Sequence, residues 1–162
     1  MGWRVKDAPA AYEYAVSKGA VPFDAKPGFM ELRLPSVYGI GNSVLYFADQ
    51  RTGHSIYDVD FVPIPSVDQH PPAVAGMHFF GIVQYIGAGR SYDWIEFYKE
   101  LFGMTLIPDE QRFGIMPAGK LLRTPALQPG NRFMVQLVEP EAFQACGVDP
   151  SRRGETLGVA DY

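Results

Sequence analysis

Cysteine, long apolar runs and an export signal are what this 162-residue sequence most lacks. Its single cysteine, Cys146, excludes an internal disulfide and fits the reducing cytoplasm. No apolar run approaches the ~20 residues that a membrane helix requires. The N-terminal string MGWRVKDAPAAY has no apolar signal core. We therefore expect a cytoplasmic protein that has no membrane partner.

Basic residues are also few. The 14 Lys and Arg residues stand against 18 Asp and Glu residues, which gives a formal net charge of -4. Binding to nucleic acid normally needs a concentrated basic face, so we expect no nucleic-acid partner. The chain is rich in apolar residues, since 47% of its residues are hydrophobic and 14% are aromatic. That composition can bury a sizeable core in one domain or in two small modules.

The clearest structural pattern spans residues 76–104. An apolar run at residues 78–86, rich in β-branched and aromatic side chains, is typical of a buried strand. After a Gly-Ala-Gly corner, apolar side chains recur at helical spacing from Ser91 to Phe102, and Gly103 suits a left-handed helix end. The strands predicted after this helix cover residues 105–107, 113–116, 121–123 and 132–138.

The first half has the same order of elements. A short strand at residues 3–5 precedes Asp7, which suits a helix N-cap, and Pro9, which suits a first helical turn. Gly19 would end that helix. The strands predicted next cover residues 30–34, 43–47 and 56–62.

Both halves therefore read as a strand, a helix ending in glycine, and further strands. Because one βαβββ unit cannot bury its sheet alone, two such modules should pair into a curved sheet or barrel around a cavity. We predict an α+β fold of this kind, while a ferredoxin-like arrangement is the competing interpretation. The predicted organisation is a first module at residues 1–63, a proline-rich linker at 64–76, a second module at 77–140 and a tail at 141–162.

Four strings in the chain resemble 4-hydroxyphenylpyruvate dioxygenase of the vicinal oxygen chelate superfamily. They are VKDAPAAYEYAVSKGA (5–20), ELRLPSVYGIGNSVLYFAD (31–49), SIYDVDFVP (55–63) and WIEFYKELFGM (94–104). The family has four βαβββ modules, and this chain resembles the central two. Met1 falls close to where the family's second module opens, from which we expect upstream sequence to have been lost or the start codon to have been misassigned.

The resemblance implies a non-haem Fe(II) held by two His and one Glu, and a 2-oxo acid substrate that chelates it. The fourth module, which carries the second His and the Glu, has no counterpart here. Counting back from the Gly-Arg pair at 89–90 puts the first His position at Gly81. His78 would point to the opposite face of the strand unless a bulge intervenes, so it is only a fallback. His54 and His70 fall in predicted loops. We expect no metal and no cofactor.

A cavity between the two modules would still have candidate ligand-binding residues. The positions that match the family's cavity strands are Met1, Asp60, Gly81 and Gln136. One carboxylate and one amide are a weak ligand set for iron. Aromatic side chains could line the same pocket, although core packing is the alternative for each of them. The full set of pocket candidates is Asp60, Tyr85, Gln136, Phe79 and Phe133.

Three functions stay open on the sequence. The first is a 4-hydroxyphenylpyruvate dioxygenase-like protein that lacks the iron site and binds a small aromatic or 2-oxo acid ligand. The second is an active Fe(II)-dependent dioxygenase or lyase whose site, from His78, Asp60 and Gln136, is assembled across a homodimer. The third is a structural or partner-binding subunit that uses the tail at 149–162. Because unpaired strand edges favour exchange with a second copy, we expect a homodimer.

Overall fold

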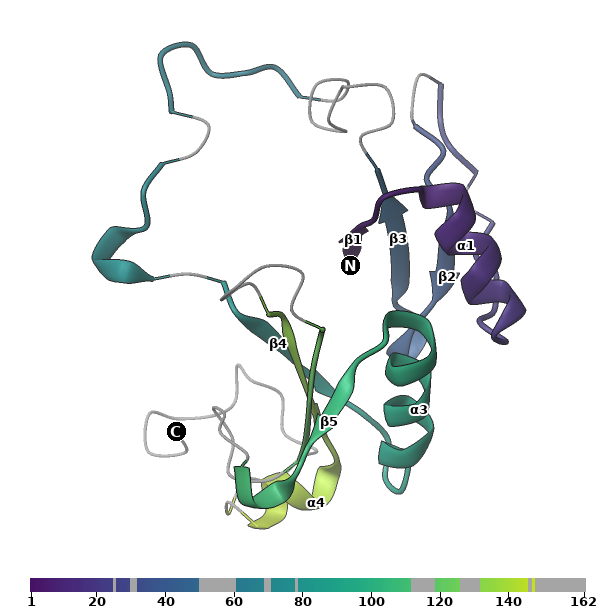
Figure 1. The fold of residues 1–162 in the computed structure, drawn as a ribbon, viewed down its shortest axis with the longest axis vertical. Coiled ribbons are helices and arrows are strands. Elements are labelled where there is room, and N and C mark those ends of the chain that lie inside the picture. The colour runs from purple at the N-terminus through teal and green to yellow at the C-terminus, as the bar shows by residue number, and fades with distance from the viewer. Residues whose placement is uncertain are drawn as a thin grey trace. The chain divides into compact units, whose positions relative to one another are not determined.

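The computed structural model describes residues 1–24, 26–29, 32–49, 61–68, 71–77, 79–111, 119–125, 132–145 and 147. The chain divides into two compact units, Met1–His78 and Phe79–Tyr162. Each unit contains its own sheet and a helix that follows the first strand of that sheet (Figure 1). The finer boundaries expected from the sequence, with a linker at 64–76 and a tail at 141–162, stay a prediction.

The first unit is built on a three-stranded sheet of order β1-β3-β2. Strand β1 runs parallel to β3, and β2 runs antiparallel to it. The helix α1 packs on β2 and β3 (Figure 1). The elements are β1 (Gly2–Arg4), α1 (Ala8–Ser17), β2 (Ser36–Tyr38), β3 (Val44–Ala48) and the short 3-10 helices η1 (Ile40–Asn42) and η2 (Val74–Gly76).

Helix α1 begins and ends close to the predicted positions. The Asp7 carboxylate accepts a hydrogen bond from the Ala10 amide at 3.0 Å, as an N-cap should. Gly19, just beyond the end of the helix, has a φ of 92°, which favours glycine. The core under this helix contains Val37, Leu45 and Phe47, all of which are buried.

The second unit has a four-stranded sheet of order β4-β7-β6-β5, in which β4 and β7 are parallel and the other neighbours antiparallel. Helix α3 ends at Gly103 in the left-handed conformation, as predicted. No helix in the described part of the chain is long and apolar enough to cross a membrane. The elements are β4 (Gly81–Tyr85), α3 (Ser91–Phe102), β5 (Thr105–Ile107), η3 (Asp109–Gln111), β6 (Lys120–Arg123), β7 (Met134–Val138) and α4 (Pro140–Ala145).

Tyr98 fixes which face of the second sheet lies toward α3. Its side chain is fully buried, and its hydroxyl donates a hydrogen bond to the Gln84 side-chain oxygen. Gln84 therefore faces α3. Since side chains alternate along a strand, Gly81, Val83 and Tyr85 belong to the opposite face of β4.

One strand predicted in the first half is not formed where the structure describes it. Residues 32–35 belong to no strand, and on the side away from β3 the antiparallel partner of β2 is residues 21–23, through backbone bonds from Tyr38 to Val21 and from Phe23 to Ser36. An alternating pattern marks extended chain but does not determine which segment pairs. Of the predicted strand at 56–62, residues 56–60 lie outside the described residues, and 61–62 belong to no strand.

Strand β3 lies parallel to β1 and closes the sheet of the first unit, as β7 does beside β4 in the second. In the second half, the predicted strand at 113–116 lies outside the described residues. The six-residue helix α4 was not predicted, and it begins at a proline, a residue whose fixed φ suits a first helical position.

A carboxylate directly after the closing strand caps the helix in each unit. Asp49 follows β3 and accepts a hydrogen bond from the Ala8 amide at 2.6 Å. Glu139 follows β7 and accepts hydrogen bonds from the Gly89 and Ser91 amides, each at 2.8 Å. Such an anion satisfies helix N-terminal amides and complements the helix dipole.

The backbone contacts next to these caps also correspond. The Val5 amide donates to the Ala48 carbonyl at 2.8 Å, and the Ile86 amide donates to the Val138 carbonyl at 2.9 Å. Matching Ala48 with Val138 makes Tyr46 the counterpart of Gln136, two residues earlier on each closing strand. The two units therefore share one plan, residue by residue, along their opening and closing strands.

Candidate functional site

The face of the second sheet that points away from α3 contains two of the four predicted pocket residues that the structure describes, Tyr85 and Gln136. In the β4–β7 ladder Gly81 pairs with Met134, and Val83 pairs with Gln136. Tyr85 lies two residues beyond Val83 on the same face. Tyr85 is 50% exposed, whereas Gln136 is only 3% exposed. The structure thus brings Tyr85 and Gln136 to one face beside Gly81, and Arg123, which pairs with Met134, lies on that face as well.

Gly81, which the sequence analysis predicts as the position of the family's first iron ligand, has no room for a side chain. A Cβ atom built there would lie 2.5 Å from the Met134 carbonyl oxygen and 3.1 Å from the Met134 Cβ. Carbon atoms in contact normally stay about 3.5–4.0 Å apart. A histidine at position 81 would therefore need the Met134 backbone to shift.

Phe79 and Phe133 meet at the ends of the strands that they precede. Their ring centroids are 5.7 Å apart and the ring planes are tilted by 39°. Phe79 is 77% exposed, so the pair is open to solvent on that side. Asp60 and His78, the other predicted residues, lie outside the described residues.

Metal-ligating side chains are not gathered in the part of the chain that the structure describes. Among those residues no group of three His, Cys, Asp or Glu side chains could hold a metal ion. All three histidines and Cys146 lie outside that part. The described residues therefore bear on iron binding only through the close backbone packing at Gly81.

Among the side chains of the second unit with shifted pKa values, Tyr98 and Glu139 serve the fold. Burial raises the pKa of Tyr98 far above its ordinary value, so its hydroxyl remains a hydrogen-bond donor to Gln84. Hydrogen bonds from Ser91, and then from the Gly89 amide, lower the pKa of Glu139, so it stays a carboxylate. Neither group lies on the Gly81 face.

The two carboxylate caps were not predicted from the sequence, although a signal exists. The closing strands end in YFAD at 46–49 and QLVE at 136–139, each with an acidic residue after an apolar strand. An alignment of the two halves on their closing strands, in place of their helix-ending glycines, would have found Asp49 and Glu139 together.

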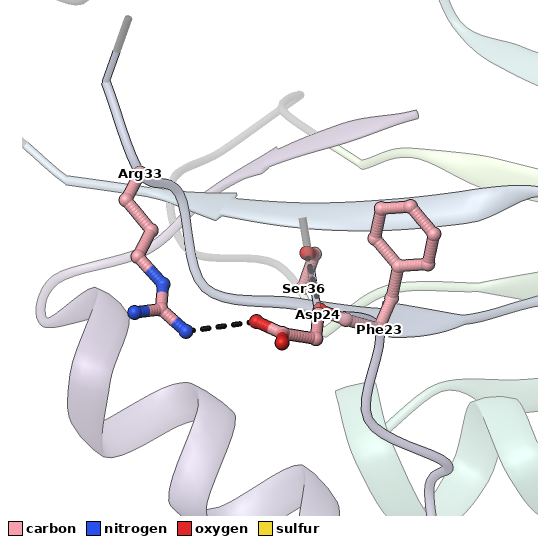
Figure 2. A network of polar contacts seen from close by, with 4 residues as sticks. All are labelled: Phe23, Asp24, Arg33 and Ser36. Carbon is pink, nitrogen blue, oxygen red and sulfur yellow. Dashed lines mark hydrogen bonds and ion pairs between the residues drawn. The ribbon is translucent and has the colours of Figure 1, made fainter. Parts of the chain in front are cut away.

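A separate cavity of about 460 Å³ lies in the first unit, beside α1. Across it, Arg33 Nη2 lies 2.8 Å from Asp24 Oδ1, and both side chains are 73% exposed (Figure 2). The Ser36 hydroxyl donates to the Phe23 carbonyl at 3.2 Å and holds the two segments together (Figure 2). None of these residues was among the predicted site residues. The apolar and aromatic residues of the lining include Tyr12, Pro22, Leu34 and Pro35.

Comparison with known proteins identifies the relatives of this chain. The family model described as hydroxyphenylpyruvate dioxygenase, HPPD, N-terminal matches residues 1–62. The 4-hydroxyphenylpyruvate dioxygenase of Pseudomonas sp. (strain P.J. 874) is 41% identical over 103 residues, or 63% of this chain and 29% of that protein. The chain is thus similar to 4-hydroxyphenylpyruvate dioxygenases over these residues.

Other proteins are similar to the chain as well. Hemolysin VllY of Vibrio vulnificus (strain CMCP6) is 51% identical over 61 residues, or 38% of this chain and 17% of that protein. A solved structure of a xylose isomerase-like TIM barrel/4-hydroxyphenylpyruvate dioxygenase fusion protein matches with a TM-score of 0.59 and 26% identity, covering 94% of this chain and 23% of that one.

The predicted α+β fold of the vicinal-oxygen-chelate type is confirmed for this chain. Its matches span less than a third of the length of the curated relatives. The closure of the two modules around a common cavity stays a prediction.

Proposed function

We propose that this chain is a 4-hydroxyphenylpyruvate dioxygenase-like protein that binds a small aromatic or 2-oxo acid ligand without the family's iron centre. One observation carries the proposal. The predicted position of the first iron ligand is a glycine whose Cβ would lie 2.5 Å from the Met134 carbonyl oxygen. A backbone packed this closely does not take an imidazole by a change of side chain alone.

The ligand would bind on the Gly81 face of the second sheet. The Gln136 side chain offers an amide that can both donate and accept hydrogen bonds, which suits a carboxylate or oxo group. The Tyr85 ring and the Phe79–Phe133 pair offer aromatic surface for a ring of the ligand. Asp60 lies outside the described residues, and its place in the pocket stays a prediction. Apart from Asp60 and Tyr85, these side chains have no titratable proton, so the set is suited to recognition more than to proton transfer.

The proposal includes a cytoplasmic homodimer. Strands β1 and β4 each lie at an edge of their sheet. Open strand edges promote pairing between chains. The segment between the sheets also exposes large apolar side chains, among them Val62, Ile64 and Met77. Light scattering of the eluted protein should give twice the chain mass, and a monomer at all concentrations would contradict this part of the proposal.

The first experiment separates metal from ligand. Protein purified without chelator is analysed for bound metals and titrated anaerobically with Fe(II), and we expect no stoichiometric binding. Phenylpyruvate and 4-hydroxyphenylpyruvate are then titrated calorimetrically with and without EDTA. Binding of either compound with a Kd that EDTA leaves unchanged is the expected result.

Two variants connect that binding to the Gly81 face. Gln136→Leu should weaken 2-oxo acid binding about tenfold, since a hydrogen bond to a charged group contributes about 1.5–3 kcal/mol. Gln144→Ala, at an exposed position of α4, removes an amide elsewhere and should change nothing. Tight binding of one Fe(II) per chain, with oxygen-dependent turnover, would overturn the proposal in favour of a dioxygenase with its site at His78, Asp60 and Gln136.

A further inference from the structure

The cavity of the first unit contains two opposite charges that do little for the fold. The Arg33 guanidinium and the Asp24 carboxylate are 2.8 Å apart, and each side chain is 73% exposed. Ion pairs this exposed contribute about 0–1 kcal/mol to stability. Each of the two groups can therefore exchange its partner for a ligand at low cost.

Among the described residues, the contact between Arg33 and Asp24 uses only part of the hydrogen-bonding capacity of either group. The contact between them joins Arg33 Nη2 to one oxygen of Asp24 (Figure 2). A guanidinium has five N–H donors in a planar fork, and a carboxylate has about four acceptor sites. A carboxylate can thus approach Arg33, and an ammonium can approach Asp24, from the cavity.

The remaining walls are mostly apolar. Tyr12 contributes from α1, and Pro22, Leu34 and Pro35 contribute from the two segments that the Ser36–Phe23 bond holds together. A volume of about 460 Å³ lies within the ~300–1,000 Å³ range of small-molecule sites. The cavity therefore combines an apolar wall with one cation and one anion side by side.

We propose that this cavity binds a free α-amino acid with an apolar or aromatic side chain. The ligand's carboxylate would pair with Arg33, its ammonium with Asp24, and its side chain would lie on the wall that includes Tyr12. A 2-oxo acid has no cation, and Asp24 would repel its carboxylate. The site is thus distinct in place and in ligand from the one proposed on the second sheet, and it stands independently of that proposal.

Three related compounds test the charge pattern on the full-length chain. L-phenylalanine has both charges, 3-phenylpropionate has only the carboxylate, and phenethylamine has only the ammonium. Amide NMR titrations should show shifts at residues 22–24 and 33–36 for L-phenylalanine, with at least about tenfold weaker binding of the other two compounds. Equal shifts with all three compounds, or none with L-phenylalanine, would overturn the proposal.

Substitutions assign the two contacts. Asp24→Asn and Arg33→Gln should each weaken L-phenylalanine binding about tenfold, and Asp24→Asn should also reduce the preference over 3-phenylpropionate. Lys26→Gln removes a neighbouring exposed charge and should leave binding unchanged. Circular dichroism should show all three variants folded, because the substituted side chains are exposed. Unchanged binding in both Asp24→Asn and Arg33→Gln would assign the shifts to another surface and refute the site.

Discussion

The two units follow one plan but are packed to different degrees along their opening strands. In the first, a Cβ added at Gly2 of β1 would meet nothing within 4 Å. In the second, a Cβ added at Gly81 of β4 would meet the Met134 backbone at 2.5 Å. The first sheet also has three strands and an isolated Pro22–Val37 bridge, whereas the second has four strands.

Gly2 and Gly81 are not matched positions, because Gly2 corresponds to Val83, but side chains at matched positions also differ in kind. Because Arg4 pairs with Ala48 and Tyr85 pairs with Val138, Trp3 in the first unit corresponds to Gln84 in the second. The helix-facing side of the second sheet thus has a polar pair where the first has an indole. The two units have similar backbones but different side chains at matched positions. A function found for one unit therefore does not extend to the other, and each unit needs its own functional test.

The largest difference should come from adding one methyl group to each opening strand. Gly81→Ala forces a Cβ against the Met134 carbonyl and should lower the free energy of unfolding by about 2–3 kcal/mol, as overpacking does. Gly2→Ala should change it by less than about 0.5 kcal/mol. Urea unfolding of both variants, followed by circular dichroism, measures the contrast. Equal small effects would mean that β4 and β7 separate easily and that position 81 can accept a ligand side chain.

A smaller effect should follow from breaking the polar pair of the second unit. Tyr98→Phe removes the hydroxyl that donates to Gln84 and leaves a half-buried carbonyl oxygen without that donor. The expected loss is about 1–2 kcal/mol in urea unfolding. Tyr92→Phe on the same helix is the control, because Tyr92 is 73% exposed. A loss no larger than that of the control would indicate that water replaces the tyrosine hydroxyl.

The two carboxylate caps should contribute less again, and the cap of the second unit has a pH signature. The pKa of Glu139 is lowered in the folded chain by hydrogen bonds from Ser91 and Gly89. Its stabilisation is therefore present above the unfolded pKa, about 4.3, and is lost as pH falls through the lower folded pKa. Glu139→Gln should cost about 1 kcal/mol at neutral pH, and this cost should vanish in acid.

The comparison variant is Asp49→Asn in the first unit, which changes the cap of α1. Unfolding of both variants is measured from neutral pH down to about pH 3, the range in which carboxylates titrate. A cost of Glu139→Gln that is constant over that range would show that the carboxylate charge is not what stabilises the start of α3.

Local signals predicted much of this structure. Asp7, Pro9 and Gly103 mark the helix ends where they were expected, because caps depend on a few neighbouring residues. The strand pairing of the first unit was predicted less well. Residues 30–34 alternate like a strand, yet residues 21–23 pair with β2, because pairing depends on contacts far apart in the sequence.

The two candidate sites also differ in how far the sequence predicts them. Position 81 was found by counting from a Gly-Arg pair, but its close approach to Met134 depends on a strand more than fifty residues later in the chain. The cavity with Asp24 and Arg33 has no sequence signal of its own. It arises where two extended segments and α1 meet, which only the fold determines.

The smallest expected effect concerns that cavity. Arg33→Gln should change the free energy of unfolding by less than about 0.5 kcal/mol, because the ion pair with Asp24 is 73% exposed at both ends. Lys120→Gln, which removes the Lys120–Asp109 pair of the second unit, should have a similarly small effect, since those side chains are 39% and 55% exposed.

If both variants unfold like the parent in urea, exposed charges contribute little to the stability of either unit. Any loss of amino-acid binding in Arg33→Gln would then reflect the contact itself. A clear destabilisation by Arg33→Gln alone would instead make the pair part of the scaffold of the first unit.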